Sequence, residues 1–192
     1  MLSLLIGLVL FLGVHSVRIV ADDWRTRFMA SKGEKAYKGL YTLVSLLGFG
    51  LVIWGFGQAR ETPVLLWVPP VGLRHLASLL TLVAFIFLAA AYLPGNGIKA
   101  RLHHPMVLGV KTWALAHLLA NGMLAHVLLF GSFLVWSVLS FRAARKRDTL
   151  NNTVYASGSL PATVATVVVG AVAWVVFSLW LHGLLIGIKP FG

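Results

Sequence analysis

The stretch that decides the fold is residues 101–122, RLHHPMVLGVKTWALAHLLANG. It begins with charged residues and two histidines, continues as an apolar run, and ends at an asparagine–glycine pair. Proline is tolerated in the first turn of a helix, so His104-Pro105 predicts a helix start. His117 lies twelve residues beyond Pro105, about 18 Å into that helix at about 1.5 Å per residue. A titratable side chain near the middle of a membrane-sized span is rare and usually functional.

The composition predicts an all-α polytopic membrane protein. Of 192 residues, 59% are hydrophobic and 11% are charged, whereas a soluble domain has about 25% charged residues. The chain leaves no room for a separate soluble domain, so residues 1–192 are predicted to form a single transmembrane domain. The net charge of +11 comes from basic residues at the ends of apolar runs, which indicates membrane topology rather than nucleic-acid binding. With no cysteine, disulfides and thiolate haem ligation are excluded.

Six apolar runs, each near the roughly 20 residues that a spanning helix needs, predict a bundle of about six transmembrane helices. The first run has no basic segment before it and no small-residue cleavage site after it. We therefore expect a retained helix rather than a signal peptide. The fourth and fifth runs are joined by two residues only, which predicts a tight helical hairpin. The runs are residues 2–20, 39–57, 65–93, 105–120, 123–141 and 162–188.

The lysines and arginines predict the orientation, because positive charge stays on the cytoplasmic side. Thirteen of them lie on one side of the predicted topology and three on the other. Both termini should therefore face the periplasm of a bacterial inner membrane. The thirteen are Arg18, Arg25, Arg27, Lys32, Lys35, Lys38, Lys99, Arg101, Lys111, Arg142, Arg145, Lys146 and Arg147, and the three are Arg60, Arg74 and Lys189.

Two of the seven histidines, His15 and His117, fall inside apolar runs without an acidic neighbour in sequence. A buried imidazole needs a hydrogen-bond partner or a metal, so both are candidate ligands. Trp113 lies four residues before His117 and shares its helical face. It is a candidate wall for a flat aromatic ligand, or simply a packing residue.

The other histidines are predicted near the membrane surfaces. His103 and His104 belong to the inner surface, where an interfacial role is the simplest interpretation, and His104 is also a secondary candidate ligand. His75, His126 and His182 lie close to the outer ends of three helices. His75, next to Arg74, and His182, close to Trp180, suit the aromatic belt at headgroup level, and all three are secondary candidate ligands. If the three converge, they would form a zinc or copper site or a proton relay.

Three motifs resemble the NnrU family of bacterial membrane proteins. They are HSVR at residues 15–18, GEKAYKGLY at residues 33–41 and HHPMVLGVKTWALAHLLANG at residues 103–122. The resemblance extends over essentially the whole chain. The family takes its name from a link to nitrite and nitric oxide reductase expression, which implies a role in denitrification.

NnrU proteins are similar to the 15-cis-zeta-carotene isomerase, an integral membrane enzyme with haem b. In that relative, the histidine of an early HS motif and the histidine of W-x-x-x-H hold the haem. The resemblance therefore implies haem b on His15 and His117. The isomerase also has a cysteine three residues before its second ligand, where this chain has Ala114. A cysteine-for-histidine ligand exchange is thereby excluded.

Three functions remain open from the sequence. The first is a haem b membrane protein linked to denitrification and nitric oxide metabolism. The second is a membrane isomerase acting on a carotenoid-like isoprenoid. The sequence HHP-x-x-x-G also resembles the cofactor loop of isoprenylcysteine-type methyltransferases. Those enzymes need a long cytosolic carboxy-terminal portion after that loop, whereas this chain is predicted to return to the membrane. The third is a non-catalytic assembly or transport factor. The expected partners are the lipid bilayer and a hydrophobic or small-molecule ligand, with no nucleic acid.

Overall fold

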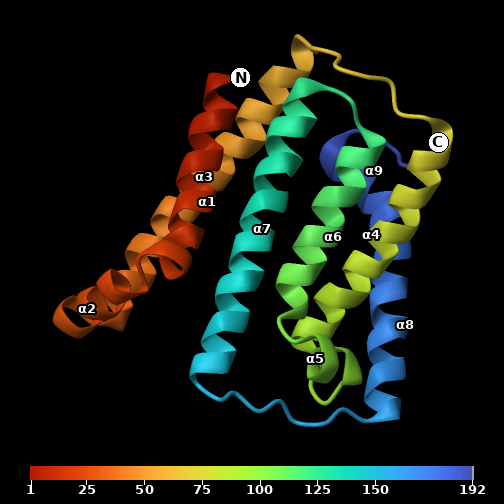
Figure 1. Ribbon diagram of the computed structural model, residues 1–192. Helices are drawn as coiled ribbons and strands as arrows, with labels where there is room; N and C mark the ends of the chain where they lie inside the picture. The colour runs from red at the N-terminus through yellow and green to blue at the C-terminus, as the bar shows by residue number, and fades with distance from the viewer. Residues whose placement is uncertain (192) are drawn as a thin grey trace. The chain divides into compact units, whose positions relative to one another are not determined.

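The computed structural model describes residues 1–191, and these form helices and connecting loops without a β-strand (Figure 1). The predicted all-α class is therefore confirmed. The elements are α1 (Leu2–Val20), α2 (Asp22–Lys32), α3 (Glu34–Glu61), α4 (Val71–Tyr92), α5 (Gly97–Leu102), α6 (Pro105–Ala120), α7 (Leu124–Leu150), α8 (Leu160–Val176), the π-helix η1 (Phe177–Leu181) and α9 (His182–Ile186).

Five helical segments are long and apolar enough to cross a membrane: α1, α3, α4, α7 and the continuous segment Leu160–Ile186. The fourth predicted run corresponds to α6, an apolar helix of 16 residues. Two predicted loops need correction. The charged segment after α1 is largely helical, as α2, and α7 continues to Leu150, nine residues beyond the predicted end of its apolar run.

The chain divides into two compact units, and each is described by itself. Unit 1 comprises residues 1–69 and 117–143, and unit 2 comprises residues 70–116 and 144–191. The division passes through α6 and α7, so each of these helices contributes to both units.

Unit 1 is built on the close packing of α1 along α3. Gly7 of α1 approaches the α3 backbone so closely that an added Cβ would lie 2.6 Å from the nitrogen of Val52. Small residues allow such contact between helices in a membrane, where packing replaces the hydrophobic effect. At one end of the unit, the amide of Leu66 donates to the carbonyl of Gly122 over 2.8 Å. The loop before α4 and the α6–α7 turn therefore meet, as expected for segments on one side of a membrane.

Unit 2 is built on α4 packed against α8. An added Cβ at Gly170 would lie 2.6 Å from the Cα of Ile86. Trp174 of α8 donates from Nε1 to Thr81 of α4 over 2.9 Å. Near α5, the amide of Ser159 donates to the carbonyl of Gly95 over 2.8 Å. The α4–α6 connection and the segment before α8 thus meet within unit 2.

Large apolar side chains are exposed along the helices, which is the pattern of a protein surrounded by lipid. A soluble monomer rarely exposes a broad apolar patch, and each unit has one. On α3 the exposed residues include Leu43, Leu46, Leu47, Phe49, Ile53 and Trp54, and on α8 they include Val164, Val168, Val169, Val172 and Val176.

Candidate functional site

His15 lies on α1 in an aromatic environment inside unit 1. Its Nδ1 is 2.6 Å from the carbonyl oxygen of Phe11. A carbonyl only accepts, so Nδ1 is the donor, and in a neutral ring Nε2 then keeps its lone pair. The ring centroid lies 4.3 Å from Phe11, 5.1 Å from Tyr41 and 6.1 Å from Trp136. The side chain is therefore held by its own helix, with one nitrogen able to act as a ligand.

His117 lies on α6 and stacks on Phe130 of α7, with ring centroids 4.4 Å apart and an interplanar angle of 28°. Phe130 itself is buried, 6% exposed. The carbonyl of His117 accepts from Nδ2 of Asn121 over 2.8 Å. This bond satisfies a carbonyl in the last turn of the helix and explains why the helix stops at the asparagine–glycine pair.

The two predicted ligands contact α7 at different levels. His15 touches Trp136 and His117 touches Phe130, and six residues of an α-helix span about 9 Å. Both histidines belong to unit 1 and border the same helix, α7. The structure does not place them directly opposite each other, so their pairing stays a prediction.

The outer histidines give a mixed result. His126 lies between aromatic rings, 5.2 Å from Phe56 and 6.1 Å from Phe130, and its Nδ1 is buried without a hydrogen-bond partner. His182 bonds through Nδ1 to the carbonyl of Ile188 over 2.6 Å. His75 is exposed. Across residues 1–191, no group of three or more histidines or acidic residues is arranged to hold a metal ion. This finding does not support the predicted zinc or copper site at the three outer histidines.

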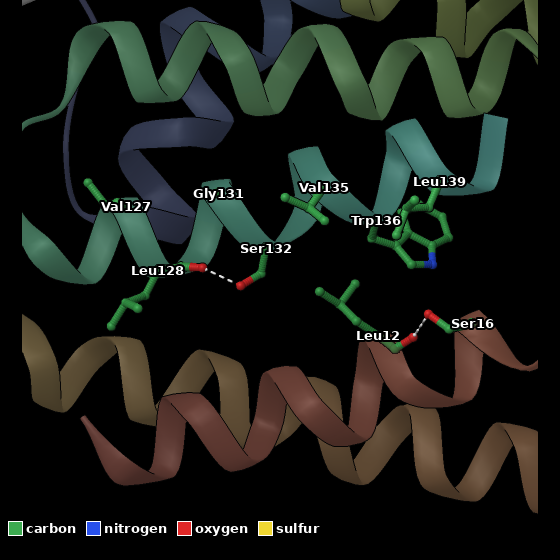
Figure 2. A pocket seen from close by; sticks show the side chains of 9 residues that line it. All are labelled: Leu12, Ser16, Val127, Leu128, Gly131, Ser132, Val135, Trp136 and Leu139. Atoms are coloured by element: carbon green, nitrogen blue, oxygen red, sulfur yellow. Dashed lines mark hydrogen bonds between the residues drawn. The ribbon is translucent and has the colours of Figure 1, made fainter. Parts of the chain in front are cut away.

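Beside His15, an apolar groove runs between α1 and α7 (Figure 2). Its volume is about 490 Å³, within the range of small-molecule sites. Its two hydroxyls are occupied: Ser16 donates to the Leu12 carbonyl over 2.7 Å and Ser132 to the Leu128 carbonyl over 2.6 Å. The groove is lined by Leu12, Ser16, Val127, Leu128, Gly131, Ser132, Val135, Trp136 and Leu139.

Unit 2 contains a polar cluster that we name the inner lock, and its members are His103, His104, Arg145, Asp148 and Tyr155. One carboxylate oxygen, Oδ2 of Asp148, is 2.8 Å from Nε2 of His104 and accepts from the Tyr155 hydroxyl over 3.1 Å. Arg145 also donates to it, over 3.5 Å. The lock joins the start of α6 to the end of α7 and the loop that follows.

The remaining members complete the lock. The ring of His103 stacks on Tyr155 with centroids 3.9 Å apart and an interplanar angle of 15°, and Arg145 contacts Nδ1 of His103. Burial, reinforced by the hydrogen bond to Asp148 and its negative charge, raises the pKa of the Tyr155 phenol. His103 and His104 both have positive φ, 59° and 23°, a conformation that costs free energy in residues other than glycine.

His104 was a secondary ligand candidate from the sequence, but its Nε2 is engaged by Asp148 and lies 3.3 Å from the Tyr155 hydroxyl. Asp148 and Tyr155 were missed, because they lie 44 and 51 residues from His104 and share no local motif with it. Ala114, at the position of the isomerase cysteine, is fully buried and offers no group that could exchange as a ligand.

A family model described as "NnrU protein" matches residues 3–190, nearly the whole chain. No curated protein and no solved structure matches the chain. The family assignment thus confirms the resemblance that the three motifs indicated.

Proposed function

The chain belongs to the NnrU family, and from that premise we propose that it binds haem b through His15 and His117. We place it in the bacterial inner membrane, where it would serve nitric oxide metabolism and denitrification. A helical membrane protein supplies what a bis-histidine haem requires, namely imidazoles on neighbouring helices and apolar surroundings.

The observation that carries the proposal is the hydrogen bond between Nδ1 of His15 and the Phe11 carbonyl. Histidines that bind metals commonly donate their second N–H to a carbonyl, which fixes the tautomer and the ring orientation. The Nδ1 contact with the Phe11 carbonyl, 2.6 Å long, has this form. The neighbouring rings of Phe11, Tyr41 and Trp136 would exclude water from the iron-binding nitrogen.

His117 is the proposed second axial ligand. The ring nitrogens of both histidines would hold the iron, each through a bond near 2 Å. The rings now contact α7 at positions six residues apart. Ligation by both histidines would require their side chains to reach one iron, whereas ligation by His15 alone would use only the nitrogen that the Phe11 carbonyl leaves available. When bound, the haem would supply one-electron or gas-binding chemistry.

The absorbance spectrum of the purified protein tests the proposal. The wild type should show a Soret band, with resolved α and β bands on reduction. His117→Ala should lose the haem or the low-spin spectrum, and His15→Ala should lose the haem. His103→Ala is the matched control and should keep the spectrum, because His103 stacks on Tyr155 in the inner lock. A wild type without haem, or two single variants with wild-type spectra, would refute the ligand assignment.

The orientation is tested separately. The proposed orientation rests on the distribution of lysine and arginine, because positive charge stays on the cytoplasmic side. Reporter fusions at Gly192 should give a periplasmic signal, and fusions within residues 151–158 a cytoplasmic one. A cytoplasmic signal at Gly192 would reverse the proposed orientation.

A further inference from the structure

We propose that unit 2 binds the headgroup of an anionic phospholipid at a surface formed by α5 and the end of α7. We call this the basic surface, and its exposed cations are Lys99, Arg101, Arg145 and Lys146. The ligand is the phosphodiester of a lipid whose headgroup has a net negative charge, and its acyl chains lie beside the apolar helices. The proposal uses no residue of the haem site, and it stands whether or not the protein binds haem.

The first argument is that the inner lock brings two basic segments together. Arg145 of α7 contacts Nδ1 of His103, the residue that follows α5 directly. Arg101 lies two residues before His103, and Lys146 is the next residue after Arg145. His103 and Arg145 are 42 residues apart in the sequence, so their contact places the cations of both segments in one region of unit 2.

The second argument is that this positive charge has little acidic charge to balance it. Asp148 is the one acidic residue in the sequence of unit 2. Its side chain is 14% exposed, and its carboxylate is already shared by His104, Tyr155 and Arg145. The basic surface therefore keeps a net positive charge, which attracts an anionic partner.

The basic segment of unit 1, residues 21–38, differs in this respect. It has five basic and three acidic residues. Arg25 pairs with Asp22 over 3.3 Å, and Lys38 pairs with Glu34 over 2.7 Å. Much of the charge is therefore balanced inside the segment, and an anionic headgroup should prefer the basic surface to residues 21–38.

The third argument selects a lipid over a soluble acidic protein. The apolar run of α7 ends at Phe141, and Arg145 lies four residues later, about 6 Å along the helix. The headgroup layer on each side of a bilayer is about 5–7 Å thick, so Arg145 lies at its depth. Leu102 and Met106, close to Arg101 in sequence, are 43% and 42% exposed. An anionic lipid supplies a phosphate for the cations and acyl chains for these apolar side chains, whereas a soluble protein would have to reach into the hydrocarbon boundary to cover them.

The side chains of Arg101 and Lys146 suit a phosphodiester. A guanidinium can donate two parallel hydrogen bonds to phosphate oxygens, and an ammonium acts as a point charge. The long apolar stems lie along the acyl region while the charged heads stay among the headgroups. Within residues 1–191 both side chains are exposed and neither forms an ion pair, so a phosphate would replace water rather than an existing partner.

The test is photolabelling of the full-length protein in phosphatidylcholine nanodiscs that contain a small share of photoactivatable phosphatidylglycerol, followed by peptide mapping. The label should concentrate in residues 97–106 and 142–150 rather than in residues 21–38. Photoactivatable phosphatidylcholine should show no such preference. Unlabelled phosphatidylglycerol should displace the label, whereas inorganic phosphate should not, because it lacks the acyl chains.

The decisive variant combines Arg101→Gln with Lys146→Gln. A cation near an anionic membrane surface changes binding about fivefold, so each substitution should weaken the displacement by phosphatidylglycerol by about that factor. Lys32→Gln combined with Lys35→Gln is the matched control, because it removes the same charge from exposed side chains outside the basic surface. This control should retain the labelling of residues 97–106 and 142–150. Arg101→Lys should keep most of the binding, because the charge remains.

Three results would overturn the proposal. Equal labelling of the basic surface by the two lipids would show that no anionic headgroup is recognised. An equal loss in the decisive variant and in its control would mean that the lipid responds to the net charge of the protein and not to this surface. Displacement by inorganic phosphate would identify a site for a free anion instead of a lipid. These measurements need no haem, so this proposal and the haem proposal can fail separately.

Discussion

His15 and His104 are both hydrogen-bonded to an oxygen atom, but through different ring nitrogens, Nδ1 in His15 and Nε2 in His104. Nδ1 of His15 bonds to the carbonyl four residues earlier in its own helix, and this bond does not involve the other ring nitrogen, Nε2. Nε2 of His104 is engaged by Asp148 and lies close to Tyr155, far along the chain. The bond of His15 stays within one helix, whereas that of His104 connects segments far apart in the chain.

The difference follows from where the residues lie in the chain. His15 is inside an apolar run without acidic residues, so a backbone carbonyl is the partner its own helix can supply. His104 stands at a helix start among polar loops, where a carboxylate and a phenol can reach it. A histidine in a membrane span is therefore a better ligand candidate than one at the surface, even when the surface motif is more conspicuous.

The largest effect that would sharpen this comparison is loss and recovery of haem at His15. His15→Gly should lose the Soret band, because the imidazole that would bind the iron is gone. Imidazole added to the buffer should restore the band by entering the vacated space. Glycine in a helix costs only about 1 kcal/mol, so the helix should persist. Difference absorbance with and without imidazole measures the recovery.

His104→Gly is the counterpart from the inner lock. It should keep its haem spectrum and show no response to imidazole. If His104→Gly loses haem and His15→Gly keeps it, the contrast between the two histidines is reversed and the surface histidine is the ligand.

A smaller effect is expected from Asp148→Ala, which removes the shared acceptor of the inner lock. His104, Tyr155 and Arg145 would lose their common partner. Because the cluster is partly solvated, the local cost should be about 1 kcal/mol. Limited proteolysis within residues 151–158 should become several-fold faster, since local opening governs cleavage. Asp148→Asn should be intermediate, because its amide oxygen still accepts.

Asp23→Ala provides the control for that measurement, because Asp23 is exposed on α2. Equal proteolysis rates in the Asp148→Ala and Asp23→Ala variants would show that the inner lock does not hold the loop.

Hydropathy predicted the apolar helices well and the polar ones poorly. The bounds of α1 and α6 match the predicted runs, because in both the apolar residues end where the helix ends. In α7 the helix continues through RAARKRDTL; arginine, lysine and alanine are good helix formers, but a hydropathy pattern marks them as loop. The short helix α5 carried a readable signal in Asn96, an N-cap whose side chain accepts from Lys99.

The candidate site divides in the same way. His15 and His117 could be selected from sequence because depth in the membrane is a local property of an apolar run. Their partners could not, since Tyr41, Trp136 and Phe130 are brought in by packing. The inner lock forms where the start of α6, the end of α7 and the loop after α7 come together. The spacing of residues in the sequence does not predict that contact. The buried, unpaired nitrogen of Trp136 is likewise a property of the folded chain alone.

The smallest effect is expected from Tyr155→Phe, which removes one hydroxyl from the inner lock. The free energy of unfolding should fall by about 0.5 kcal/mol, at the low end for a hydrogen bond.

The informative measurement is a phenolate absorbance titration of the wild type and the Tyr155→Phe variant. Burial and Asp148 raise the pKa of Tyr155 above its ordinary value of 10.0. The contribution of the neutral phenol to stability is thus fully present below about pH 10 and is lost as the pH rises through the raised pKa. The wild type minus variant titration should contain one phenolate with a midpoint above 10.0, and Asp148→Ala should lower that midpoint. A midpoint at or below the ordinary value would mean that Tyr155 and Asp148 are not in contact, and the inner lock would then lack its link to the loop after α7.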